Sequence, residues 1–155
     1  MQTPDFPCDG GCACDAVRYR LSEDPLELHV CHCTDCQTIS GTAFVMSMAI
    51  HRRSFELLRG EPALFSFETP DGKRKHHRRC TDCGCHLWSE PDRLAVINVV
   101  QAATLDDTRW LQPIAHIWTR SAQPWVSIPT DVLLYEKEAA DALDLVRAWK
   151  GRSDA

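Results

Sequence analysis

Short apolar segments that alternate with polar residues recur along most of the chain, and glycine or proline separates several of them. Residues 17–21 (VRYRL) alternate in the way of a half-buried strand, and residues 94–102 (LAVINVVQA) are typical of a buried one. This pattern predicts a chain that is mostly β. The expected strands lie at residues 17–21, 43–50, 54–60, 63–69, 94–102 and 114–119.

Residues 69–73 (TPDGK) form a strong turn signal, because proline presets φ and glycine accepts φ > 0. We expect this turn to join two antiparallel strands, the second of which contains the basic run at residues 73–79 (KRKHHRR). Such a run can indicate a solvated strand, cations that offset the charge of metal-bound thiolates, or nucleic-acid binding. We rank these interpretations in that order.

The tail at residues 136–150 (EKEAADALDLVRAWK) is predicted to be a helix. It contains neither glycine nor proline, and its acidic residues lie early and its basic residues mostly late, which matches the helix dipole. We expect its apolar stripe to pack on the sheet or at a subunit contact. The stripe consists of Ala139, Ala142, Leu143, Val146 and Trp149.

Length and charge limit the function classes. A chain of 155 residues fits one domain, and a formal net charge of -5 does not favour a general nucleic-acid binder. No apolar run is long enough to span a bilayer, and residues 1–11 lack the basic start and apolar core of a secretory signal. We therefore expect a cytoplasmic protein with neither a membrane nor a nucleic-acid partner.

Nine cysteines are the unusual feature of the composition. In a reducing compartment, clustered thiols more often bind metal or perform redox chemistry than form stable disulfides. Cys8 stands apart from the others. The remaining cysteines form the groups Cys12-x-Cys14, Cys31-x-Cys33-x-x-Cys36 and Cys80-x-x-Cys83-Gly84-Cys85.

Two of these groups together predict a structural zinc site. A Cys-x-x-Cys-Gly turn presents two sulfurs to one ion, as at Cys80 and Cys83, and a tetrahedral structural site needs four ligands. Cys12 and Cys14 are the natural second pair. Such a site would tie the N-terminal region to the middle of the chain.

The third group then has three sulfurs, from Cys31, Cys33 and Cys36. Three protein ligands and an open position are typical of a catalytic zinc site, where water or substrate completes the coordination shell. The open position favours a soft donor such as a thiol. Sequence leaves open whether a protein side chain closes the site, and the candidates are Cys8, Cys85, His29, His32 and His86.

Four segments in order resemble the family of glutathione-dependent formaldehyde-activating enzymes, whose domain centromere protein V shares. They are GGCACDAVRYRL, CHCTDCQTISGTAF, RRCTDCGCHLW and HIWTRSAQPWVSIP. The resemblance covers residues 8–129 and leaves residues 130–155 as a C-terminal extension that contains the helix. It implies a β-tent (Mss4-like) fold of antiparallel sheets.

The resemblance also implies two zinc ions per chain. One is a structural zinc on Cys12, Cys14, Cys80 and Cys83, and the other is a second zinc on Cys31, Cys33 and Cys36. The implied activity joins glutathione and formaldehyde into S-(hydroxymethyl)glutathione, which makes the enzyme a carbon–sulfur lyase in the reverse direction.

This chain departs from the family pattern at Asp15, where the family usually has glycine, and we expect the first turn to differ there. Three function hypotheses follow. The first is a lyase of this kind that takes a small thiol such as glutathione as partner, with Cys31, Cys33 and Cys36 as the reactive centre. The second is a non-catalytic zinc-stabilised module that binds a small thiol or a protein. The third is a thiol redox protein that resembles methionine sulfoxide reductases and uses Cys8 or Cys85.

Overall fold

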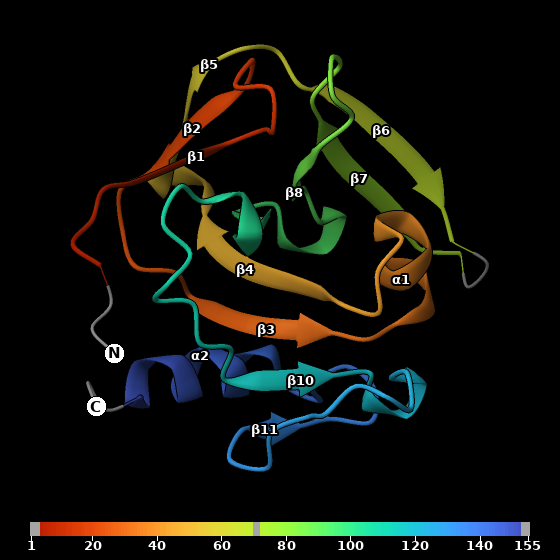
Figure 1. Cartoon of the computed structure of the whole chain (residues 1–155). Helices are drawn as coiled ribbons and strands as arrows, with labels where there is room; N and C mark the ends of the chain where they lie inside the picture. Colours follow the sequence, from red (N-terminus) through yellow and green to blue (C-terminus); the bar gives the residue numbers. More distant parts are fainter. Residues whose placement is uncertain (1–3, 70–71, 153–155) are drawn as a thin grey trace.

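The computed structural model describes residues 4–69 and 72–152, which form two β-sheets and two α-helices (Figure 1). The smaller sheet has the order β1-β2-β5, and the larger has the order β11-β10-β3-β4-β9-β8-β7-β6. The prediction of a mainly β chain is confirmed. The strands are β1 Cys8–Gly11, β2 Arg18–Leu21, β3 Glu27–Cys31, β4 Val45–His51, β5 Phe55–Arg59, β6 Ala63–Glu68, β7 Arg74–Arg79, β8 His86–Ser89, β9 Ile97–Gln101, β10 Ala115–Ile117 and β11 Leu133–Leu134, and the helices are α1 Thr34–Ser40 and α2 Ala142–Gly151.

The larger sheet is mixed rather than purely antiparallel, which corrects the expected pairing at one end. β10 runs parallel to both β3 and β11, while the other neighbours in this sheet are antiparallel. Parallel neighbours need a long connection, and most of the chain separates β3 from β10. This pairing puts His116 beside Val30 and Ile117 beside Cys31.

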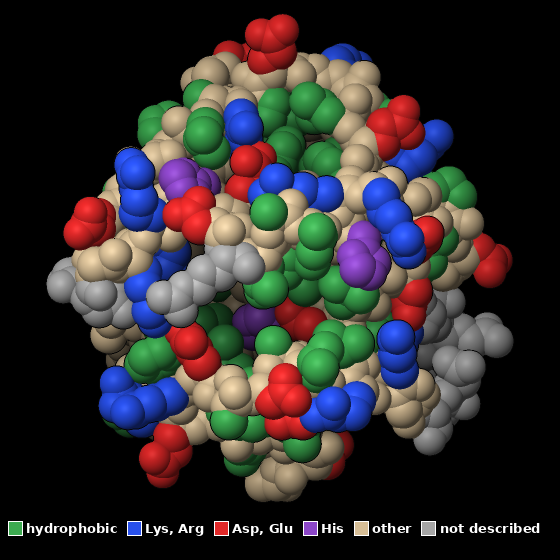
Figure 2. Space-filling model, turned by 180° about the vertical axis from the view of Figure 1, so that it is seen from behind, with side chains coloured by type: hydrophobic (Ala, Val, Ile, Leu, Met, Phe, Trp, Pro, Cys, Tyr) green, Lys and Arg blue, Asp and Glu red, His purple; other side chains and the backbone are tan. Residues whose placement is uncertain are grey.

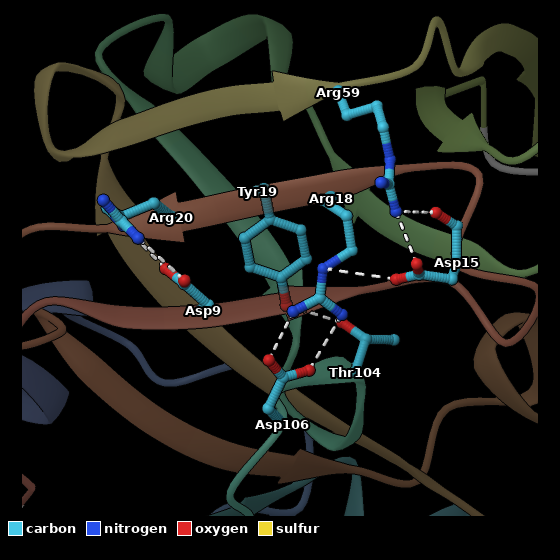
Figure 3. Close-up of polar contacts among 8 residues, drawn as sticks. All are labelled: Asp9, Asp15, Arg18, Tyr19, Arg20, Arg59, Thr104 and Asp106. Atoms are coloured by element: carbon cyan, nitrogen blue, oxygen red, sulfur yellow. Dashed lines mark hydrogen bonds and ion pairs between the residues drawn. The ribbon is translucent and has the colours of Figure 1, made fainter.

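The hydrophobic core lies between the two sheets. Tyr19 of β2 is fully buried there and stacks on Phe55 of β5, with ring centroids 5.2 Å apart. Its hydroxyl donates a hydrogen bond of 2.7 Å to Oγ1 of Thr104, whose own hydroxyl donates to the carbonyl of Gln101 (Figure 3). Such a bond stabilises the fold by about 1 kcal/mol. A Cβ at Gly10 would lie 2.5 Å from the Tyr19 ring, so this strand position requires glycine.

The C-terminal helix is shorter than predicted and buries only part of the predicted stripe, Trp149 but not Leu143. α2 begins only at Ala142, because Asp141 caps it by accepting a hydrogen bond from the backbone N–H of Leu143. Residues 136–140 precede it as bends and turns. Leu145 and Trp149 are the buried side chains, whereas Leu143 of the predicted stripe is 58% exposed. The helix packs against β3.

The predicted hairpin is present as β6 and β7, which pair antiparallel from Ala63 with Arg79 to Glu68 with Arg74. Residues 70–71 of the predicted turn lie outside the described residues, but Gly72 has a φ of 78°, as expected for its place in a turn. β7 lies between β6 and β8, and of its residues only His77 is buried, while Arg74 is exposed and the others are half-buried. The first interpretation of the basic run, a solvated strand of a hairpin, is therefore confirmed in part.

The C-terminal extension packs on the larger sheet, since β11 extends it and α2 covers β3. The boundary between residues 129 and 130 stays a prediction, as does the cytoplasmic location. Two parts of the predicted segments lie outside the described residues. They are residues 1–3 of the N-terminal segment, which we predicted not to be a secretory signal, and residues 153–155 of the C-terminal extension. Across residues 4–69 and 72–152, each helix is too short or too polar to cross a membrane.

Candidate metal centres

The first cysteine group joins two turns that are distant in sequence. Cys12 and Cys14 follow β1, while Cys80 and Cys83 follow β7, and the four sulfurs lie within 4.8 Å of one another. The sulfur of Cys14 is 3.5 Å from that of Cys12 and 3.7 Å from that of Cys80. A tetrahedral zinc with Zn–S bonds of about 2.3 Å requires sulfurs about 3.8 Å apart. The spacing fits a zinc ion and is too long for a disulfide.

Left-handed residues close both turns. Gly84 has a φ of 72°, and its N–H donates to the carbonyl of Cys80. Asp15 has a φ of 62°, so the aspartate adopts the left-handed conformation that glycine would supply. That the turn differs from the family's stays a prediction. Figure 3 shows why this conformation is tolerated: the Asp15 carboxylate lies between Arg18 and Arg59, at 3.5 and 2.5 Å.

Backbone donors favour the thiolate form in this cluster. The N–H of Val17 donates to the Cys12 sulfur at 3.2 Å. Hydrogen bonds from the backbone N–H of Cys85 and then of Cys14 lower the pKa of Cys83 to about 6. A metal binds thiolate rather than thiol, so these donors prepare the cluster for a cation.

The second group is compact and local. Cys31 ends β3, Cys33 caps α1 and Cys36 lies in the first turn of α1, with their sulfurs within 4.8 Å of one another. The backbone N–H of Cys36 donates to the Cys33 sulfur at 3.3 Å. Hydrogen bonds from the thiols of Cys31 and Cys36 strongly lower the pKa of Cys33. Three sulfurs, one of them already inclined to the thiolate form, fit a soft divalent cation.

The other sulfur candidates for a fourth ligand lie elsewhere. Over the described part of the chain, neither metal-binding group includes Cys8 or Cys85. The negative charges of Cys83, Cys12 and Cys80 help to raise the pKa of Cys85, after burial, which puts its sulfur beside the four-cysteine cluster. Cys85 is therefore not the residue that completes the three-cysteine cluster.

The histidine candidates are engaged in other contacts. His32 is fully buried, and its Nε2 lies 2.8 Å from Nδ1 of His116. His86 stacks on His77 at 4.1 Å, and its Nε2 lies 3.1 Å from the carbonyl of Trp88. Among the described residues, the group around Cys31 contains no histidine. The cluster thus has three protein sulfurs and, among the described residues, no fourth protein ligand.

A pair of titratable residues on the strand that leads into this cluster was not identified from the sequence, which offered His29 only as a candidate metal ligand. Glu27 and His29 lie on β3, where Nδ1 of His29 is 2.7 Å from a carboxylate oxygen of Glu27. Alternate strand residues share a face, so Glu27, His29 and Cys31 point to the same side of the sheet. The period-2 spacing in ELHVC was the signal for this arrangement. Figure 2 shows the molecule hollowed on the side away from the viewer in Figure 1, with a histidine and an acidic side chain in the hollow.

Part of the basic run pairs with carboxylates within the protein. Arg78 pairs with Glu90 at 2.7 Å, and His76 lies 2.9 Å from Asp92. Lys73, just before β7, contacts Glu138 at 3.2 Å. These pairs offset part of the positive charge that could otherwise attract a nucleic acid.

Comparison with known proteins points to one family. The model of the family described as glutathione-dependent formaldehyde-activating enzyme matches residues 7–121. Among solved structures, a crystal structure of a Rhodobacter sphaeroides protein is similar, with a TM-score of 0.50 and 18% sequence identity. That match covers 68% of this chain and 91% of the other, and at this identity it bears on the fold alone.

Proposed function

The chain belongs to the family of glutathione-dependent formaldehyde-activating enzymes, and we propose that it joins a small thiol such as glutathione to formaldehyde or a related aldehyde. The observation that carries the proposal is the three-cysteine cluster, whose sulfurs gather without a fourth protein ligand among the described residues. The four-cysteine cluster holds the fold, and the three-cysteine cluster receives the thiol.

Zinc suits both all-sulfur donor sets, and at the three-cysteine cluster it would leave a fourth position for a thiol and lower the pKa of that thiol. Cys31, Cys33 and Cys36 are the residues that would hold it. The three thiolates offset much of the charge of the cation, so we assign the proton transfer to a side chain.

His29 is the residue that we propose moves the proton. Glu27 accepts a hydrogen bond from Nδ1 of His29, which leaves Nε2 as the atom that can exchange a proton. Nε2 takes the proton of the thiol and returns it to the aldehyde oxygen, while the sulfur–carbon bond forms and the carbonyl π bond breaks. In the lyase direction the same atom takes the hydroxyl proton as the sulfur–carbon bond breaks.

The proposed function is tested with the unchanged protein. We expect elemental analysis to find two zinc ions per chain, and calorimetry to detect glutathione binding at millimolar concentration or below. Exchange spectroscopy by NMR should then show faster conversion between glutathione and S-(hydroxymethyl)glutathione than in buffer. Binding without faster exchange would instead indicate a non-catalytic thiol-binding module. The proposal would be refuted if zinc-loaded protein neither bound glutathione nor accelerated the exchange.

The role of His29 gives a separate prediction. A positioned general acid–base contributes roughly 100-fold or more to rate, so His29→Gln should slow the exchange by about that factor. Glu27→Gln should lower the rate less, because its amide oxygen still accepts from Nδ1 but no longer stabilises a protonated ring. Glutathione affinity, measured by calorimetry, should stay within about two-fold in both variants. An unchanged exchange rate in His29→Gln would assign the proton transfer to water.

A further inference from the structure

Each turn of the four-cysteine cluster contains one exposed sulfur ligand, and a left-handed residue follows it. The exposed ligands are Cys14 and Cys83. Asp15, directly after Cys14, has a φ of 62°, and Gly84, directly after Cys83, has a φ of 72°. Glycine adopts such a φ without strain, whereas aspartate is strained there, although less than most residues. The two turns therefore share a backbone conformation but differ in the strain that it carries.

An arginine donates to the carbonyl of each left-handed residue. Nη1 of Arg79 donates to the carbonyl of Gly84 at 3.3 Å. Nη2 of Arg59 lies 2.5 Å from the carbonyl oxygen of Asp15 and 2.5 Å from its carboxylate oxygen Oδ2 (Figure 3). The second contact of Arg59 depends on the side chain of residue 15. Arg59 thus holds the main chain and the side chain of Asp15 together.

The other arginine beside this turn is bound mainly to a different carboxylate. Both terminal amino groups of Arg18 donate to Asp106, and its Nε lies 3.5 Å from Asp15 (Figure 3). That distance is too long for a strong hydrogen bond, so Arg18 adds charge near Asp15 but little control of its backbone. The firmer contact with the turn comes from Arg59.

The smaller sheet fixes the base of the Arg59 side chain. Arg59 is the last residue of β5 and pairs with Arg18 of β2, next to a shift in register. The following residue, Gly60, has a φ of 84°, and a Cβ there would lie 2.4 Å from the carbonyl oxygen of Ala16. The end of β5 therefore lies directly against the turn. Arg59 reaches Asp15 from an ordered strand rather than from a free loop.

We propose that Arg59 is a positioning residue for the structural zinc site. It holds Asp15 in the left-handed conformation, keeps the sulfur of Cys14 at the cluster and so slows the loss of zinc. In this way the chain accommodates aspartate where its family usually has glycine. Arg79 contacts a glycine, which needs no such support. The inference concerns the four-cysteine cluster alone and is independent of the reaction proposed for the three-cysteine cluster.

The competing explanation is electrostatic. Four thiolates on a divalent cation carry an excess negative charge, and any nearby cation offsets part of it. If this were the role of Arg59, then Arg79, which contacts the other turn in a similar way, would act alike. Replacement of Asp15 would then not change the need for Arg59. The two explanations therefore differ in what Asp15→Gly does.

The test measures the rate at which an excess of a chromogenic chelator removes zinc. The variants are Arg59→Met, Asp15→Gly and the double variant with both changes, with Arg79→Met as the matched control. Release of two ions gives two phases, and Cys33→Ser, which should keep only the zinc of this cluster, identifies the phase to follow. An exposed ion pair alone is worth less than about 5-fold in an equilibrium constant, whereas relief of backbone strain is worth about 5-fold or more.

We expect Arg59→Met to release this zinc at least about 5-fold faster than the unchanged protein, because Asp15 can then relax and carry Cys14 away. Arg79→Met should change the rate by less than about 2-fold. In the Asp15→Gly background, Arg59→Met should also change it by less than about 2-fold, since glycine keeps the turn without support.

Three results would overturn the role of Arg59 and leave the function proposed for the three-cysteine cluster standing. They are an unchanged release rate in Arg59→Met, equal acceleration in the two arginine variants, and an effect of Arg59→Met that is as large with glycine at position 15 as with aspartate. A four-cysteine cluster that holds no zinc in the unchanged protein would overturn the inference directly.

Discussion

Cys80→Ser is expected to be the most destabilising single substitution in the four-cysteine cluster. Cys80 is 2% exposed and packs in the hydrophobic core, and its sulfur meets that of Cys14, 66 residues away in sequence. Structural zinc sites contribute roughly 10–16 kcal/mol in small peptides, which equals or exceeds the total stability of most domains. Losing about 4 kcal/mol alone would lower the Tm of a chain of this size by roughly 8–16 °C.

We therefore expect Cys80→Ser either to be recovered unfolded or to melt at least about 10 °C below the unchanged protein, with less than one equivalent of tightly bound zinc in this cluster. Differential scanning calorimetry and elemental analysis measure the two quantities. The control is Cys8→Ser, a half-buried cysteine in β1 that lies outside both groups and whose sulfur is 3.8 Å from the carbonyl oxygen of Asp5. Its Tm should shift by less than about 4 °C. Similar melting of the two variants would contradict a structural role for the four-cysteine cluster.

Local spacing explains why the sequence alone predicts the grouping of the cysteines. Cys31, Cys33 and Cys36 are near neighbours in the chain, so the end of β3 and the first turn of α1 suffice to gather their sulfurs. The turn of Cys80 and Cys83 is likewise closed by its own Gly84. In both cases the chemistry depends on a few consecutive residues, and such features are visible in a sequence.

Features that depend on the arrangement of distant strands could not be predicted from the sequence. The parallel pairing of β10 with β3 brings His116 to His32, and neither segment carries a local signal for the other. The start of the C-terminal helix was placed too early, since Glu136 to Ala140 have good helix propensity but Asp141 caps the helix instead.

The two clusters should also separate functionally, because only the four-cysteine cluster is part of the hydrophobic core. Cys12 and Cys80 belong to that core, although Cys14 and Cys83 are exposed. In the three-cysteine cluster Cys31 is buried outside the core, and Cys33 and Cys36 are half-buried at the start of a short helix that contains no buried residue. A substitution in the core cluster should therefore affect the whole fold. A substitution in the three-cysteine cluster should remain local, so stability and function can be measured independently.

Cys33→Ser is the variant with the largest expected effect on function. It removes one of three sulfurs, together with the acceptor that the N–H of Cys36 uses at the start of α1, although a serine oxygen can replace the latter. We expect zinc content to fall from two ions to one per chain, glutathione binding to weaken by at least about 100-fold, and Tm to change by less than about 4 °C.

Thr38→Ala provides the matched control for Cys33→Ser, because Thr38 is an exposed residue of the same helix and lies outside both sulfur groups. It should keep both zinc ions and the glutathione affinity of the unchanged protein. Two zinc ions and normal thiol binding in Cys33→Ser would show that thiols bind elsewhere, and would end the case for the three-cysteine cluster as the reactive centre. Loss of one zinc ion with retained glutathione binding would contradict a thiol bound at the open position. A thiol sulfur can bind there only if Cys31, Cys33 and Cys36 hold the cation.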